Sequence, residues 1–131
     1  MDDMSQVHSA VQLVSFGYKY GAAPTADVLL DVRFLPNPYW VQELRDQNGL
    51  IPAVAGYVLS KPEAKKYVGA LTELVALTSL GFASDDKGVM TVVVGCTGGK
   101  HRSVSVVAAL AQQLQLRGIT VFVAHRDLGL E

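Results

Sequence analysis

The residues with the clearest chemical potential lie at 95–103, which read GCTGGKHRS. They follow a short apolar run and precede apolar residues at helical spacing, which predicts a loop from the carboxyl end of a strand to the amino end of a helix. Ligands of open α/β sheets bind at this edge, and the free N–H groups of a helix start favour an anion. Lys100 supplies charge, and Arg102 can grip two phosphate oxygens. A phosphate site is the simplest interpretation; the alternative is a tight turn with two solvated cations.

Two kinds of phosphate chemistry can be compared with this loop. A nucleotide P-loop requires G-x-x-x-x-G-K-[ST], but here the glycine spacing is one residue short and His101 replaces the hydroxyl. The pattern C-x-x-G-x-x-R-S, from Cys96 to Ser103, resembles the loop of cysteine-dependent phosphatases, in which a thiolate attacks phosphorus and an aspartic acid protonates the leaving group. Gly95 stands where that family usually has histidine, and no aspartate lies in a recognisable general-acid loop. Cys96 is therefore either a nucleophile or a small buried residue.

The elements that must position this loop alternate between strand and helix patterns. Apolar runs bounded by glycine or proline predict strands at 6–16, 28–32, 89–94 and 119–124. Helical spacing predicts helices at 60–81, started by a capping box at 60–63, and at 104–118. Proline steps and Asn48-Gly49 make 36–60 the segment expected to be loop. The strand, helix and strand from 89 to 124 form a βαβ unit, which predicts an α/β fold with a small, mostly parallel sheet flanked by helices.

Composition limits the class of protein further. The chain has 131 residues, half of them hydrophobic, with 11 Lys+Arg, 12 Asp+Glu and one cysteine. This predicts a single domain over 1–131, with disorder at the acidic residues 1–8. The charge balance argues against a dedicated nucleic-acid binder, and one cysteine excludes an intrachain disulfide framework or a multi-cysteine metal cage. No apolar run approaches the ~20 residues of a membrane span, and the start is unlike a secretory signal. We expect a cytoplasmic protein without metal or cofactor.

Four segments carry a resemblance to a known family. VSFGYKYG at 14–21, DVRFLPNP at 31–38, the loop at 95–103 and HRDL at 125–128 resemble, in matching order, the C-terminal domain of the RapZ (YvcJ) family. A P-loop domain precedes this domain in the family, so the chain resembles a free-standing second domain. The resemblance implies a non-catalytic sensor of glucosamine 6-phosphate or a related amino-sugar metabolite. It also implies a homo-oligomer, with a small RNA, an RNase and a separate P-loop protein as partners.

The resemblance also assigns residues to the site. It implies sugar-phosphate contacts by Thr97, Gly98 and Arg102. The candidate phosphate-binding residues beside these three are Gly99, Lys100, His101 and Ser103. Lys19 directly follows the first predicted strand and is expected to be functional. Arg33 has two equally weighted interpretations, a second cation for the ligand or an ion pair with Asp31.

The sequence departs from the family pattern at two places. Tyr39 stands where the family commonly has a ligand-contacting histidine; a phenol can donate a hydrogen bond but does not become cationic near neutral pH. The sequence closes on 129–131, where enterobacterial members continue into a basic tail, so we expect weaker RNA binding. The four motif segments hold five Lys+Arg and two Asp+Glu, and the remainder is acidic. This division favours a small anionic metabolite over a long polyanion.

Overall fold

The structure is a computed structural model that describes residues 9–85 and 88–130. The disorder expected for 1–8 concerns residues outside this described part. In chain order the elements are β1 (Ala10–Gly17), the 3-10 turn η2 (Tyr18–Tyr20), β2 (Val28–Asp31), the 3-10 turn η3 (Pro38–Trp40), α1 (Gln42–Arg45), α2 (Pro52–Leu59), α3 (Pro62–Ser84), β3 (Met90–Cys96), α4 (Arg102–Leu116) and β4 (Thr120–His125). The four strands and two long helices predicted from the sequence are confirmed.

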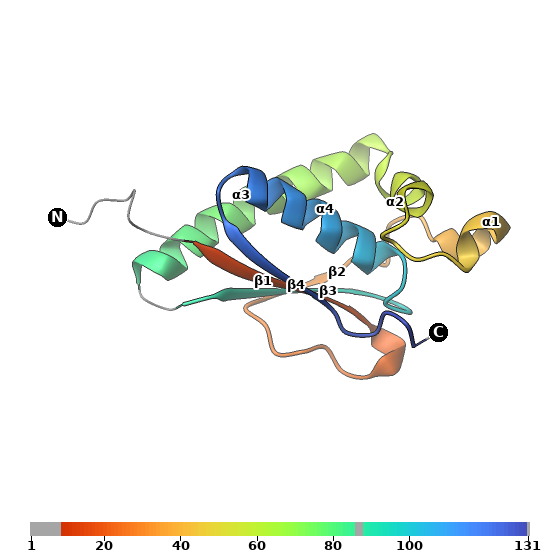
Figure 1. Ribbon diagram of the computed structural model, residues 1–131, viewed down its shortest axis with the longest axis horizontal. Coiled ribbons are helices and arrows are strands. Elements are labelled where there is room, and N and C mark those ends of the chain that lie inside the picture. The colour runs from red at the N-terminus through yellow and green to blue at the C-terminus, as the bar shows by residue number, and fades with distance from the viewer. Residues whose placement is uncertain (1–8, 86–87, 131) are drawn as a thin grey trace.

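The strands form one sheet in the order β2-β3-β1-β4, and every pairing is parallel. The predicted α/β fold is confirmed. The four carboxyl ends therefore meet at one edge, where β3 leads into α4. Figure 1 shows α2, α3 and α4 together on one side of the sheet, with the segment that follows β1 crossing the other side.

The core fills the space between the helices and the sheet. On the central strands, Leu13 lies opposite Val92, and both are fully buried. Val107 and Leu110 of α4 are also fully buried and belong to the same cluster. Six of the seven residues of β3 are buried, which agrees with its mainly apolar sequence and is usual for parallel strands.

The segment 36–60 differs from the predicted loop. It contains η3, α1 and the eight-residue α2, whose Val54 and Val58 are fully buried. The proline steps did not break this helix because Pro52 occupies its first turn, where the missing N–H has no helical partner in any case.

The predicted limits of the long helix were also wrong. The N-cap of α3 is Lys61 and makes no side-chain cap hydrogen bond, while Ser60 closes α2, so no capping box forms. Gly81 does not end the helix, which continues to Ser84. A glycine inside a helix costs only about 1 kcal/mol, and packing along α3 outweighs that cost.

Among the described residues, α3 is the one helix long and apolar enough to cross a membrane. Its apolar residues are spread along 23 positions rather than gathered in a continuous run. The helix buries Leu71 and Val75 in the core beneath it. A core helix passes the same test of length and composition.

Candidate anion-binding site

The loop between β3 and α4 places the start of a 15-residue helix at the carboxyl edge of the sheet. The N-cap residue, His101, supplies no side-chain cap to the first turn of α4. The carbonyl oxygens of Thr97 and Lys100 accept hydrogen bonds from the backbone N–H groups of Lys19 (3.1 Å) and Gly49 (2.8 Å). The negative ends of these two peptide dipoles are thus partly neutralised, while the helix start keeps the partial positive charge that attracts anions.

The loop is held by close backbone contacts that require glycine. A Cβ atom on Gly17 would lie 2.4 Å from the carbonyl carbon of Gly98 and 2.6 Å from the nitrogen of Gly99. Gly99 itself has φ of +67°, a conformation that other residues rarely adopt. A Cβ atom on Gly49 would meet the His101 carbonyl oxygen at 2.3 Å. The loop is therefore pressed against the end of β1 on one side and the turn before α2 on the other.

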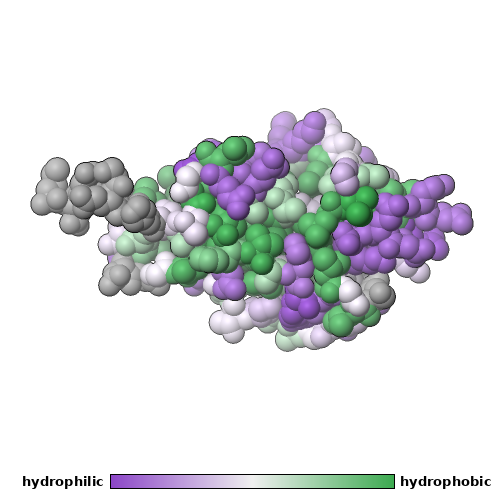
Figure 2. Space-filling view, viewed as in Figure 1, coloured by the Kyte–Doolittle hydropathy of each residue, from purple (hydrophilic) through white to green (hydrophobic). Residues whose placement is uncertain are grey.

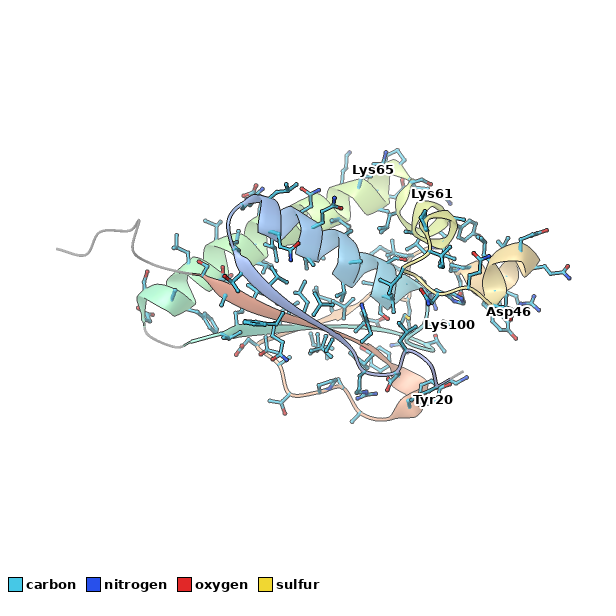
Figure 3. All side chains as sticks on the ribbon, in the orientation of Figure 1. Tyr20, Asp46, Lys61, Lys65 and Lys100 are labelled. Carbon is cyan, nitrogen blue, oxygen red and sulfur yellow. The ribbon has the colours of Figure 1, made fainter. Side chains whose placement is uncertain are left out.

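A pocket of about 420 Å³ opens beside this loop. Its lining residues are Lys19, Asn37, Tyr39, Trp40, Cys96, Thr97, Gly98, Lys100, His101 and Arg102. Three of them are cations and none is a carboxylate. Figure 3 shows Lys100 at the loop, apart from Lys61 and Lys65 on the helical layer. The pocket is thus suited to a negatively charged ligand.

Arg102 is the buried cation among the residues that line the pocket. Only 6% of the residue is exposed, and Nη1 donates hydrogen bonds to the carbonyl oxygens of Arg33 (2.6 Å) and Leu35 (3.4 Å). Nη2 donates to Thr97 Oγ1 at 3.4 Å. Within the described part of the chain, Nε and the second hydrogen of Nη2 have no hydrogen-bond partner. The guanidinium is consequently fixed in place by carbonyls and keeps donors for a ligand.

Seven of the predicted site residues line the pocket: Lys19, Tyr39, Thr97, Gly98, Lys100, His101 and Arg102. Gly99 and Ser103 do not: Gly99 packs on Gly17, and Ser103 is fully buried. The imidazole Nε2 of His101 lies 3.0 Å from the carbonyl oxygen of Arg45. Asn37 and Trp40 line the pocket but were not predicted as site residues; their position around Pro38 and Tyr39 was the available signal.

Arg33 pairs with Asp31 rather than lining the pocket. Its Nε and Nη2 atoms both donate to the carboxylate, with Nη2 2.6 Å from Oδ2. The hydrogen bond from Arg33 holds the pKa of Asp31 below its usual value. Arg33 also stacks over the Tyr18 ring, 4.1 Å from its centroid. Of its two interpretations the structure shows the ion pair with Asp31, and contact of Arg33 with a ligand stays a prediction.

Asp127, in the motif at 125–128, supports the loop through Gly17. Asp127 Oδ2 accepts a hydrogen bond from the Gly17 N–H at 2.7 Å and one from Arg126 Nη2 at 2.8 Å. Burial alone would raise the pKa of Asp127, but the hydrogen bonds from Arg126 and Gly17 outweigh it and lower the pKa. Since Gly17 touches Gly98 and Gly99, this carboxylate positions the loop rather than contacting a ligand.

The neighbouring His125 should make stability depend on pH. Its Nδ1 lies 2.6 Å from Ser15 Oγ, and burial lowers the pKa of the imidazole below 6.5. The unfolded chain therefore binds a proton at a higher pH than the folded chain, so the free energy of unfolding should fall as pH decreases from 7 towards 5. Urea unfolding across this range should show a shallower decline in His125→Gln. An equal slope in both proteins would contradict the assignment.

The fold and the site together define an α/β domain with a cationic pocket where a parallel strand leads into a helix. The family model described as the RapZ C-terminal domain matches residues 9–129, so the chain belongs to this family. A protein named "Nucleotide-binding protein" from Salinispora tropica is 49% identical over 121 residues, covering 92% of this chain and 40% of that protein. One of the same name from Mycolicibacterium paratuberculosis is 49% identical over 126 residues, with 93% and 41% covered. The chain spans about two-fifths of the length of these relatives.

Proposed function

We propose that this domain binds an amino-sugar phosphate, with glucosamine 6-phosphate as the first candidate, and acts as a non-catalytic sensor. The observation that carries the proposal is the pocket in which Lys19, Lys100 and Arg102 surround the start of α4 without a carboxylate among the lining residues. A helix start with neighbouring cations favours a phosphate group.

The remaining lining residues suit a sugar. Tyr39 and Trp40 are 47% and 75% exposed, so their rings can cover the apolar face of a hexose, while the Tyr39 hydroxyl can donate a hydrogen bond. Arg45 lies over the Tyr39 ring, 4.8 Å from its centroid, and donates from Nε to the Tyr39 carbonyl. The aromatic wall is thereby held next to the phosphate loop.

Titration calorimetry tests this function directly. Wild-type protein is titrated with glucosamine 6-phosphate, fructose 6-phosphate, inorganic phosphate and UDP-N-acetylglucosamine. We expect saturable heat from glucosamine 6-phosphate and about tenfold weaker binding in Lys100→Met, because a hydrogen bond to a charged group contributes about 1.5 kcal/mol or more. Lys61→Met is the matched control: it removes an exposed lysine that does not line this pocket.

The outcomes separate the ligand class from the site. If another phosphorylated sugar binds instead and its affinity falls equally in Lys100→Met, the proposed site is correct but the proposed ligand is not. No saturable heat from any phosphate compound would overturn the proposed function. Equal affinities for wild type and Lys100→Met would place the ligand elsewhere.

One observation favours an enzyme as the second candidate. Cys96 lines the pocket, and its Sγ donates to Ser103 Oγ at 3.2 Å, which couples the two ends of the C-x-x-G-x-x-R-S pattern. A cysteine phosphatase would release phenolate from an aryl phosphate, and Cys96→Ser should abolish the reaction. Equal background rates in both proteins would remove this candidate. The 2% exposure of Cys96 and the lining set without a carboxylate both favour the sensor.

The partners implied by the resemblance and the location expected from composition stay predictions. They are a small RNA, an RNase and a P-loop protein in the cytoplasm. RNA retention at low salt that declines steeply with added salt would support the RNA partner.

A further inference from the structure

The residues from 36 to 48 form a strap between two attachments to α4, and this strap carries an inference about the ligand. Just before the strap begins, the carbonyl oxygen of Leu35 accepts a hydrogen bond from Arg102 at 3.4 Å. Just after it ends, the carbonyl oxygen of Gly49 accepts one from Ser105 Oγ at 2.9 Å. Both ends of the strap are therefore fixed to the helix whose start forms the anion-binding site.

The strap contributes two aromatic side chains to the wall of the pocket. Tyr39 and Trp40 both line the pocket, and their rings stand at 87° to each other with centroids 5.1 Å apart, so that they form a corner. Trp40 is 75% exposed, so the fold gains little from its burial. Figure 2 shows hydrophilic residues gathered at the right of the view, where Figure 1 places α1, the next helix along the chain. An aromatic corner beside a polar surface favours a small ligand over a broad apolar partner.

Arg45 fixes the Tyr39 side of this corner. Its Nε donates to the Tyr39 carbonyl oxygen at 2.7 Å, and its guanidinium lies 4.8 Å from the centroid of the Tyr39 ring. Within the described part of the chain, no carboxylate pairs with this guanidinium. The backbone of the same residue contacts the phosphate loop, since its carbonyl oxygen lies 3.0 Å from His101 Nε2. A single residue thus connects the aromatic corner with the loop.

We propose that the aromatic corner selects the closed pyranose ring of a sugar phosphate, and that Arg45 is the positioning residue that holds the corner in place. The inference rests on the proposed function and deepens it: the loop binds the phosphate, and the strap selects the form of the sugar. The carbon-bound hydrogens of a pyranose give it an apolar face that packs on an aromatic ring. Two perpendicular rings can contact a face and an edge of such a rigid ring together, whereas an open-chain sugar must first be ordered.

The role of Arg45 follows from the cost of ordering a side chain on binding. Ordering one side chain lowers an affinity by about threefold to tenfold, and a ring that is already held avoids this loss. In Arg45→Met the contact with His101 and the attachments at Leu35 and Gly49 remain, because they use backbone carbonyls, so this variant should fold. The lost positive charge weakens every phosphate ligand alike. The informative quantity is therefore the ratio of two affinities.

Titration calorimetry with two matched ligands measures this ratio. The ligands are glucosamine 6-phosphate and its open-chain form, made by borohydride reduction, which carry the same phosphate and amino groups. We expect wild type to bind the closed ring at least about tenfold more tightly. This preference should fall about threefold to tenfold in Arg45→Met and in Trp40→Ala, which removes an exposed ring. Arg117→Met is the matched control: it removes an exposed arginine, paired with Glu73, that does not line this pocket, and should keep the wild-type ratio.

The results distinguish a failure of this inference from a failure of the proposed function. Equal affinities of wild type for the two ligands would overturn the inference while the phosphate site stands. A wild-type ratio in either Arg45→Met or Trp40→Ala would overturn it as well. If wild type binds neither ligand, the proposed function and this inference fall together.

Discussion

Replacing Arg102 with methionine should weaken phosphosugar binding about 100-fold and also destabilise the fold. The guanidinium donates to the carbonyl oxygens of Arg33 and Leu35, and Arg102 also lines the pocket proposed for the ligand. Loss of two charge-assisted hydrogen bonds to a phosphate corresponds to about 3 kcal/mol, or about 100-fold in affinity. The two carbonyls lose their donor, so the free energy of unfolding should fall by about 2 kcal/mol. Calorimetry measures the first effect and urea unfolding the second.

Arg102→Lys separates charge from geometry. A lysine keeps the positive charge but cannot hold the carbonyls and a phosphate at the same time, because its ammonium lacks the planar fork. We expect it to recover part of the stability and little of the affinity. Wild-type affinity in Arg102→Lys would show that the fork does not contact the ligand.

The second large effect is expected from Gly17→Ala. Gly17 has an extended backbone with φ of −115°, so the added methyl group causes no conformational strain. It would instead overlap backbone atoms of Gly98 and Gly99, which cannot rotate away as a side chain could. Overpacking of this kind costs about 1–3 kcal/mol and should move the loop, so both unfolding free energy and ligand affinity should decrease.

Gly81→Ala provides the matched control for that change. Gly81 lies in α3, and a Cβ atom there would meet nothing within 4 Å. The substitution should raise the free energy of unfolding by about 0.5–1 kcal/mol, since alanine is the better helix former. If Gly17→Ala behaved like Gly81→Ala in urea unfolding, the close contact between β1 and the loop would be wrong.

The fold could be predicted where burial is strong and local signals agree. The run Val92, Val93 and Val94 is fully buried in the structure, and such a run has few alternatives to a strand. The helical elements within 36–60 were not predicted because a proline can either break a helix or occupy its first turn. Pro38 and Pro52 each start a short helical element, whereas the prediction took proline as a breaker.

The sequence could predict which loop forms the site but not how the side chains around that loop are arranged. The pattern around Lys100 and Arg102 located the pocket, since a helix start beside glycines and cations is a local signal. Whether Arg33 contacts a ligand or pairs with Asp31 depends on its side-chain rotamer, which the spacing of residues in the sequence does not encode. Asp127 reaches Gly17 across 110 residues of chain, so its bracing role required the parallel sheet.

The single thiol gives the molecule a built-in reporter of local opening. Cys96 is the one cysteine in the chain, and its buried thiol donates a hydrogen bond to Ser103 Oγ. Because only 2% of Cys96 is exposed at the pocket wall, a thiol reagent should react mainly when the loop around it opens, so the labelling rate reports how often that happens. Bound ligand should slow labelling by the factor 1 + [L]/Kd, which yields an affinity without any reaction by the ligand itself.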